Sequence, residues 1–393
     1  MKRVFTVIAL SIALSIPSVF AGEVAEASAE PTAEPLAEAV AQPQEPGWKE
    51  VLNKLPKISG YLQSGLNYTS DGYGTTSGSS SFQAKRLRLI ADGNIGQKVT
   101  FRLQIEAFNG ISGSTNGNGQ KNLQVMDAFA TYTYKPGFKV RLGQFYTPMG
   151  YENYDISPAT LETVDFSNIC YRMACRNAIS YNLVDYGRDL GVMIIGDLFP
   201  SDKGFSYLHY DFAITNGGLP CKDDNNKSKD IIASLNFRPI KYLSIKGSFN
   251  WGEYAGTVND VTYNYQPMTR YIVGAWYNDP TGLDLRAEFG QLNSTDDGTD
   301  VVKETGAYVL AGWHAGQFLP VVRWDMYKDD VNETSSNNYN RILVGCTWQA
   351  FKNLKIQLNY GYTFYNDEAK EASEAAGGKK GQSQLQLMGL INF

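Results

Sequence analysis

The last ten residues of the chain alternate between apolar and polar side chains and end on an aromatic residue. One parity holds Leu385, Leu387, Ile391 and Phe393, and the other holds Gln384, Gln386 and Asn392. A period of two is that of a β-strand with one apolar and one polar face. Chain ends usually fray into polar tails. An aromatic-ended amphipathic strand here therefore indicates the closing strand of a bacterial outer-membrane β-barrel.

The N-terminus has the pattern of a secretory signal peptide over residues 1–21. Lys2 and Arg3 precede an apolar stretch over residues 4–16, and a small-residue cleavage site ends at Ala21. After residue 21 no apolar run reaches the roughly 18 residues that a spanning helix needs. A mature chain that crosses a membrane must then do so as a closed barrel. We expect the protein to be exported and to reside in the bacterial outer membrane.

Residues 22–56 are mostly Ala, Glu and Pro, which is the composition of a solvated linker. We expect this linker to be periplasmic. Residues 48–55 form either a short amphipathic helix or simply the end of the linker. Six glutamates and no Lys or Arg lie in residues 22–46, so the formal net charge of −5 partly reflects this segment. No basic cluster points to a nucleic-acid partner.

Residues 57–393 alternate between strand-like segments and turns, and this predicts an all-β, transmembrane antiparallel barrel of about sixteen strands. An even number is the rule for bacterial single-chain barrels, and about sixteen strands leave an aqueous channel. Alternate joins are short, as at 96–97, 239–240, 279–280 and 350–351, whereas the others are long and polar. The predicted strands are 57–68, 82–96, 97–109, 122–134, 138–146, 186–199, 204–217, 228–240, 241–254, 267–278, 281–293, 303–314, 316–329, 336–350, 353–366 and 381–393.

Many aromatic residues fall near the strand ends, where an outer-membrane barrel places its interfacial girdles. A soluble propeller or sandwich would explain the strands but not this placement. The predicted girdle residues are Tyr61, Tyr68, Tyr132, Tyr134, Trp251, Tyr254, Trp276, Tyr277, Trp348, Tyr360, Tyr362 and Phe393.

Strand parity predicts which charged side chains line the lumen. Arg102 alternates with Phe101 and Leu103, and a lipid-facing Arg or Lys near the bilayer midplane costs about 2–4 kcal/mol. The basic set assigned to the lumen is Arg86, Arg88, Arg102, Arg141, Lys246, Arg286, Arg323 and Arg341, and the smaller acidic set is Glu106, Asp127, Asp211, Glu288 and Asp325. Such basic side chains favour anions. Alternatively, pairs such as Arg102 with Glu106 and Arg286 with Glu288 neutralise the wall.

Residues 147–187 break the strand rhythm for about forty residues, and loops this long are usually functional or disordered. This one carries Arg172 and Arg176. Cys170 and Cys175 also lie here, in a compartment where disulfides persist. Four cysteines allow three pairings, and we favour a bridge between Cys170 and Cys175 alone, because the parity of Cys346 aims it at lipid.

Residues 141–152, Arg-Leu-Gly-Gln-Phe-Tyr-Thr-Pro-Met-Gly-Tyr-Glu, resemble the phosphate-selective porin O and P family. That family has a Gly-Gln-Phe strand end followed by Pro-x-Gly and an acidic residue. Residues 188–191 (Arg-Asp-Leu-Gly) and 215–218 (Thr-Asn-Gly-Gly) are similar to two further family patterns. The resemblance implies a sixteen-stranded, typically trimeric channel with an inward-folded third loop and a basic pore. Arg172 and Arg176 are then candidates for the constriction. A loop that caps the outside is the alternative.

These observations favour a passive diffusion channel for small hydrophilic solutes, with a preference for anions, phosphate among them. The alternative is a structural or adhesive barrel without transport. An enzyme is disfavoured, because only His209 and His314 offer a general base, and His209 beside Asp211 is more often a wall residue. We predict no cofactor. The expected partners are outer-membrane lipid, small hydrophilic or anionic solutes, and two further copies in a homotrimer.

Overall fold

The computed structural model describes residues 55–108, 123–175, 187–218, 220–221, 223–224, 226–258 and 260–393. The predicted signal peptide, the linker up to residue 54 and Arg176 lie outside these residues. By its internal contacts the chain divides into residues 1–49 and residues 50–393. The second unit is described below.

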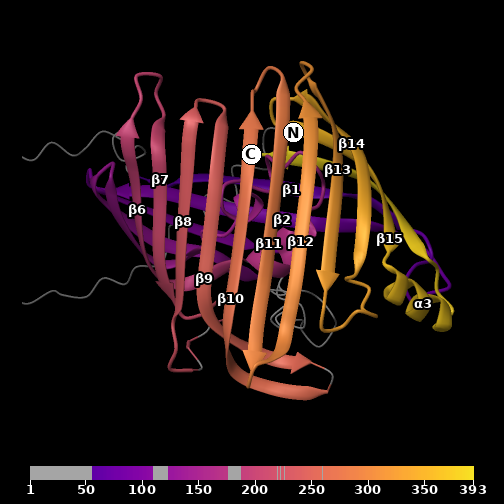
Figure 1. The fold of residues 1–393 in the computed structure, drawn as a ribbon. Helices are drawn as coiled ribbons and strands as arrows, with labels where there is room; N and C mark the ends of the chain where they lie inside the picture. The colour runs from indigo at the N-terminus through magenta and orange to yellow at the C-terminus, as the bar shows by residue number, and fades with distance from the viewer. Residues whose placement is uncertain are drawn as a thin grey trace, which may run out of the picture. The chain divides into compact units, whose positions relative to one another are not determined.

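Sixteen antiparallel strands of the described residues form one closed barrel, in which each strand pairs with the next along the chain. Figure 1 shows them side by side, from β1 in indigo to β15 in yellow. The predicted fold class is therefore confirmed. The strands are β1 (Lys57–Thr69), β2 (Ser79–Ile95), β3 (Val99–Glu106), β4 (Gln124–Lys135), β5 (Phe138–Tyr146), β6 (Arg188–Pro200), β7 (Ser206–Thr215), β8 (Asp230–Ile240), β9 (Leu243–Val258), β10 (Val261–Asn278), β11 (Leu283–Asp296), β12 (Thr299–Trp313), β13 (Phe318–Asp329), β14 (Tyr339–Phe351), β15 (Leu354–Tyr365) and β16 (Gly381–Asn392).

The C-terminal strand closes the barrel against the first strand. The register of β1 and β16 runs from Tyr61 opposite Asn392 to Thr69 opposite Gln384. Beyond it, Gly60 and Phe393 exchange two backbone hydrogen bonds of 2.9 and 3.0 Å. Pairing of the last residue leaves no open sheet edge at the seam, and an open edge is what a lipid-exposed sheet must avoid.

The outer face of the barrel is apolar, as strand parity predicts. Leu285 is 42% exposed and Val322 is 47% exposed, whereas Arg286 and Arg323, their neighbours in sequence, are 0% and 2% exposed. The same contrast recurs around the wall, with outward-facing Leu103, Leu142, Val192, Ile214, Leu235, Phe249, Val273, Val309, Ile342, Leu358 and Leu387 all exposed. This face matches a bilayer, and the charged parity turns inward.

Three of the predicted girdle aromatics face inward instead. Tyr61 is 3% exposed, with the guanidinium of Arg88 5.7 Å from its ring centroid. The guanidinium of Arg286 lies 5.1 Å from the centroid of the Trp276 ring, so Trp276 faces inward as well. Tyr254 is 2% exposed, whereas Trp251 is 45% exposed on the outer face. The prediction was wrong at these positions because it counted aromatics near strand ends without applying parity to each one.

Two joins that were predicted to be long loops are tight hairpins between long strands. β9 and β10 extend to residues 258 and 261, and β11 and β12 extend to residues 296 and 299. The second hairpin turns at Asp297 and Gly298, with φ of 48° and 80°. Positive φ at both central residues defines the type I′ turn that matches strand twist.

Part of the barrel interior is a packed apolar core, which the sequence had not predicted. Inward-facing apolar side chains of β6 to β13 pack against side chains of the segment that follows β5. The wall contributes Met193, Ile195, Ala213, Ile232, Tyr254, Met268, Ile272, Leu292, Tyr308, Leu310 and Tyr327, and the segment contributes Met149, Ile169, Met173 and Ala174. Water is therefore excluded from this side of the interior.

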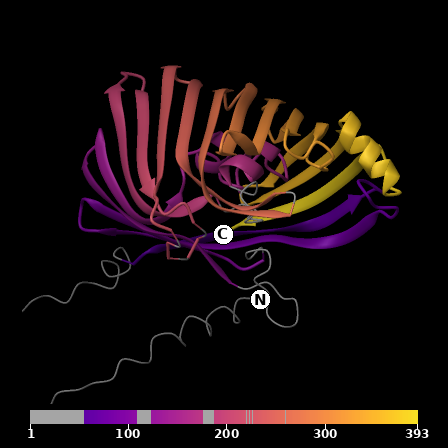
Figure 2. The same cartoon turned by 60° about the horizontal axis from the view of Figure 1, so that its bottom comes forward.

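The described loops contain three short helical elements: α2 (Tyr151–Tyr154), the π-helix η1 (Cys170–Ala174) and α3 (Asp367–Ala375). Figure 2, turned by 60°, shows the yellow helix α3 beside the strands near the C-terminus. Asn366 precedes α3, and Asp367 and Glu368 fill its first turn, where carboxylates favour a helix N-terminus. Of the helices in the described part of the chain, none is long and apolar enough to cross a bilayer.

Candidate functional site

The segment after β5 begins with a sharp turn at Gly150. This residue has φ of 69° and ψ of 176°, a conformation that essentially only glycine adopts. The backbone N–H of Tyr151 donates to Glu288 Oε1 at 2.7 Å. A Cβ atom on Gly150 would lie 2.9 Å from that same oxygen. The Pro-x-Gly of the family pattern is thus the place where the chain turns toward the barrel wall.

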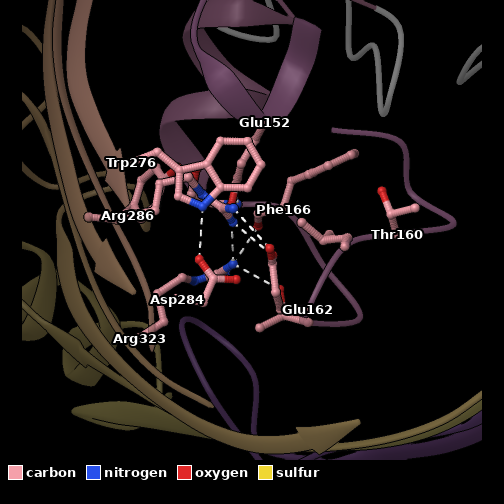
Figure 3. A network of polar contacts seen from close by, with 12 residues as sticks. Glu152, Thr160, Glu162, Phe166, Trp276, Asp284, Arg286 and Arg323 are labelled. Atoms are coloured by element: carbon pink, nitrogen blue, oxygen red, sulfur yellow. Dashed lines mark hydrogen bonds and ion pairs between the residues drawn. The ribbon is translucent and has the colours of Figure 1, made fainter. Parts of the chain in front are cut away.

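The acidic residue of the same pattern, Glu152, meets a buried ion network (Figure 3). Arg286 donates to Glu162 through two hydrogen bonds, Nη1–Oε1 at 3.0 Å and Nη2–Oε2 at 2.8 Å. Arg286 Nη2 also lies 3.3 Å from Glu152 Oε1, and Arg323 Nη1 lies 3.8 Å from it. The other oxygen of Glu152 accepts from the backbone N–H of Ser167 at 2.6 Å. Two wall arginines therefore bind the segment and are shielded from water.

Wall residues on β13 to β16 and β2 hydrogen-bond to the middle of the segment. Gln357 donates to the carbonyls of Leu161 and Thr163 at 3.1 and 3.2 Å. Asn359 accepts from the backbone N–H of Val164 at 2.6 Å. Further contacts come from Lys85, Arg86, Arg323, Thr347, Lys355 and Gln386. Lys85 turns inward at a β-bulge of β2, and the other side chains belong to the inward parity, so residues 161–166 lie against the inner wall.

Two buried carboxyls of the segment, Asp165 and Glu162, have shifted pKa values. Burial alone would raise the pKa of Asp165, but the charges of Lys85 and Arg86 and a hydrogen bond from Gln386 outweigh burial and hold the pKa well below its usual range. The pKa of Glu162 is lowered as well, because its attraction to Arg286 exceeds the effect of burial. Both carboxylates are therefore charged at neutral pH.

The far end of the segment is held by two more basic side chains. Arg172 pairs with Glu304 of β12, and its guanidinium lies 5.4 Å from the Tyr327 ring centroid. Arg270 of β10 donates to the carbonyls of Met173 and Ala174. At the opposite side, the hydroxyl of Tyr154 donates to Asp211 of β7 at 2.8 Å. The segment therefore contacts β7, β10 and β12 on one side of the barrel and β13 to β16 and β2 on the other.

Cys170, the first residue of η1, and Cys175, the residue that follows η1, are both buried, with their Sγ atoms 4.0 Å apart. A disulfide bond is about 2.05 Å long, so the predicted bridge is not formed in this structure. The π-helix brings the two side chains together, because its wider turn places residues five apart above one another. The bridge remains a prediction for the oxidised protein.

The two later family patterns contact each other. Arg188 pairs with Asp127 of β4 at 2.6 Å, with its guanidinium 3.5 Å from the Tyr146 ring centroid. The neighbouring Asp189 accepts a hydrogen bond from the backbone N–H of Gly217 at 2.8 Å. The Arg-Asp-Leu-Gly strand start and the Asn-Gly strand end therefore fix where β6 and β7 begin and end.

A cavity of about 750 Å³ lies between the inner faces of β1 to β5 and residues 154–157. Its lining carries four basic side chains, Lys57, Arg88, Arg102 and Arg141, and three acidic ones, Asp92, Asp127 and Asp155. A second cavity of about 380 Å³ lies between residues 165–172 and β13, β14 and β16, and it is lined by Arg172, Arg323 and Arg341 with Asp165 and Asp325.

The predicted lumen arginines fall into two groups. Arg86, Arg88, Arg286 and Arg323 are at most 2% exposed, so a solute reaches them poorly in this conformation. Arg102 is 40% exposed and Arg172 17%, and Arg141 is half-buried. Arg102 pairs with Asp92 at 2.7 Å and not with Glu106, which pairs with Arg88 at 2.8 Å. The predicted Arg286–Glu288 contact is bridged by the Tyr308 hydroxyl.

Several residues that hold the segment were absent from the predicted set: Glu152, Glu162, Asp165 and Arg270. Parity would have placed Arg270 in the lumen, since it alternates with Thr269 and Tyr271. The segment carboxylates carry no periodic signal, and only the folded segment brings them to their partners. Among the described residues, no cluster of three His, Cys, Asp or Glu side chains is arranged to hold a metal ion. His209 bridges Asp197 and Asp211 at 2.8 and 3.2 Å.

A closed sixteen-stranded barrel with an apolar outer face and charged cavities inside defines an outer-membrane channel of the porin class. The sequence profile of the phosphate-selective porin O and P family matches residues 57–267, more than half of the chain. The protein belongs to this family, as the sequence patterns predicted. A search of curated proteins returned no significant match.

Solved structures with the same fold are porins and related channels. The anion-selective porin from Comamonas acidovorans has 14% sequence identity and a TM-score of 0.58, with 86% of this chain and 99% of that chain covered. OprB of Pseudomonas putida has 13% identity and a TM-score of 0.59, with 88% and 96% covered. The outer membrane channel DcaP of Acinetobacter baumannii has 12% identity and a TM-score of 0.54, with 86% and 97% covered. At these identities the likeness establishes the fold.

Proposed function

We propose that this porin passes small hydrophilic solutes by passive diffusion and favours anions. The observation that carries the proposal is the charge of the 750 Å³ cavity, where four basic side chains meet three acidic ones. Among the described residues, Arg141 and Lys57 are the two basic members without a carboxylate within 4.0 Å. Such side chains lower the electrostatic barrier for an entering anion, and weak repeated contacts let it leave again.

The segment 147–175 then acts as an inward-folded third loop that narrows the lumen. Its ion pairs and hydrogen bonds to the inner wall support this role. The apolar core between the segment and β6 to β13 closes one side of the interior. Solutes are left with the side of β1 to β5, where the larger cavity lies. In this scheme Arg286, Arg323 and Arg86 position the loop. Arg141 and Lys57 meet the solute, with Arg102 and Arg88 beside them in the cavity wall, and Arg172 and Arg176 act near the constriction.

We propose a role for each remaining part of the chain as well. Residues 1–21 direct export and are removed, residues 22–56 remain as a periplasmic linker, and the barrel assembles as a homotrimer in the outer membrane. The fold shared with the anion-selective porin from Comamonas acidovorans supports the choice of anions. Catalysis has no part in this function.

Charge substitution tests the anion preference directly. The variants R141Q and K57Q each remove one positive charge from the cavity, and K352Q removes one from the turn between β14 and β15. In a KCl gradient across a planar bilayer, R141Q and K57Q should shift the reversal potential toward cation preference. K352Q should leave it unchanged, and equal shifts in all three variants would contradict the assignment of the pathway.

A further inference from the structure

The 750 Å³ cavity combines positive charge with apolar surface. Phe129, Ile90 and Ile156 line it together with Tyr146 and Tyr154. The guanidinium of Arg141 lies 4.2 Å from the centroid of the Phe129 ring. The Phe129 ring orients this guanidinium through a cation–π contact, and with Ile90 and Ile156 it also gives the cavity an apolar surface that a small organic anion can contact.

Most charges in this cavity are already neutralised by neighbours. Arg102 forms a two-pronged pair with Asp92 at 2.7 and 2.9 Å. Arg88 pairs with Glu106, Asp127 pairs with Arg188, and Asp155 pairs with Lys246 at 2.6 Å. The charge that remains for a solute is carried by Arg141 and Lys57.

Arg141 is oriented to receive a carboxylate. Its Nε donates to Thr131 Oγ1 at 3.1 Å, which fixes the plane of the guanidinium. In the part of the chain that the structure describes, its two terminal Nη atoms have no hydrogen-bond partner. Two parallel N–H groups match the two oxygens of one carboxylate.

We propose that this cavity selects small aromatic carboxylates during permeation. The carboxylate binds the Nη atoms of Arg141, and the aromatic ring contacts Phe129, Ile90 and Ile156. The volume lies within the range of about 300–1,000 Å³ that is typical of small-molecule sites. Inorganic phosphate is less well matched, since it needs several converging donors and gains nothing from apolar contacts. The inference rests on the proposed function, because it names the substrate class of the anion pathway.

The test measures how strongly benzoate, acetate and inorganic phosphate reduce the chloride current of single channels. Benzoate and acetate carry the same charge, so their difference reports the ring alone. Benzoate should reduce the current at lower concentration than acetate or phosphate. F129A should weaken the benzoate effect by about threefold to tenfold, the range expected for one lost aromatic contact, and leave the acetate effect unchanged.

R141Q should weaken the effects of benzoate and acetate alike, whereas K352Q should behave as the unchanged protein. Each variant is first shown to keep its barrel by its resistance to unfolding in SDS at room temperature. The inference is overturned if a channel with anion preference responds equally to benzoate and acetate, responds most to phosphate, or loses no benzoate sensitivity in F129A. A wild-type channel without anion preference in KCl would instead overturn the proposed function.

Discussion

Arg286 of β11 and Glu162 of the segment after β5 form a two-pronged ion pair inside the barrel, with N–O distances of 2.8 and 3.0 Å. Both side chains are almost fully buried, at 0% and 6% exposed. Trp276 covers the guanidinium, and Glu152 adds a second carboxylate. A wall arginine that parity assigned to the pore therefore binds the segment after β5.

Removing one partner of this pair should release the segment. E162Q keeps the shape of the side chain but leaves Arg286 partly uncompensated, and breaking a buried ion pair in this way costs about 3–5 kcal/mol. We expect larger and noisier single-channel currents, together with faster trypsin cleavage after Arg172. The matched control is D367N, which breaks an exposed pair with Lys370 and should change neither measurement. Unchanged current and cleavage in E162Q would contradict the docking role.

Gly150 should tolerate no side chain. Its φ and ψ cost a non-glycine residue about 1–3 kcal/mol, and a Cβ would meet Glu288 Oε1 at 2.9 Å. G150A should therefore loosen the segment and raise current noise. Gly316 also has positive φ, at 63°, but open space around a Cβ. If G316A has as large an effect on current noise as G150A, the contact with Glu288 is not what matters.

Acid should release the segment as well. The folded-state pKa values of Asp165 and Glu162 lie below their ordinary values, so their contribution to docking is complete above the unfolded pKa values of about 4. It is lost as the pH falls from there toward the folded values. Single-channel recording from pH 5 to pH 3 should show conductance rising, and D165N should weaken this dependence. A conductance that stays constant over this range would contradict the prediction.

The Cys170–Cys175 pair should form a disulfide in the oxidising cell envelope. The sulfur atoms lie 4.0 Å apart and need to approach by about 2 Å to bond. In protein purified without reductant and then unfolded, we expect two thiols to react with a maleimide reagent, and four after reduction. Four reactive thiols before reduction would show that the bridge does not form.

The strands and their inward parity were predictable from sequence because both follow from a period of two. Leu387 and Phe393 predicted the closing strand, and Arg286 and Arg323 were correctly placed inside. The hairpin at Asp297 and Gly298 was missed, although Asp-Gly is a strong turn signal. Parity applied to Tyr254 would also have corrected its placement.

What the wall side chains bind was not predictable in the same way. Glu152, Glu162 and Asp165 lie in a segment without periodicity, and their partners are more than a hundred residues away or on strands at either end of the chain. The prediction therefore treated Arg286 as available to solutes, whereas its guanidinium is bonded to Glu162 of the segment. The charged side chains that strand parity assigns to the lumen describe the pore correctly only when those paired with the segment are left out.

The central claim is that the open pathway runs along β1 to β5 and favours anions through Arg141 and Lys57. The most direct measurement is the reversal potential of the wild-type channel in a KCl gradient across a planar bilayer, followed by the same recording with phosphate in place of chloride. We predict that the wild-type channel reverses at a potential between zero and the chloride equilibrium potential. R141Q should bring this potential closer to zero, and K352Q should leave it unchanged. A reversal potential between zero and the potassium equilibrium potential, or one that R141Q does not change, would contradict the account.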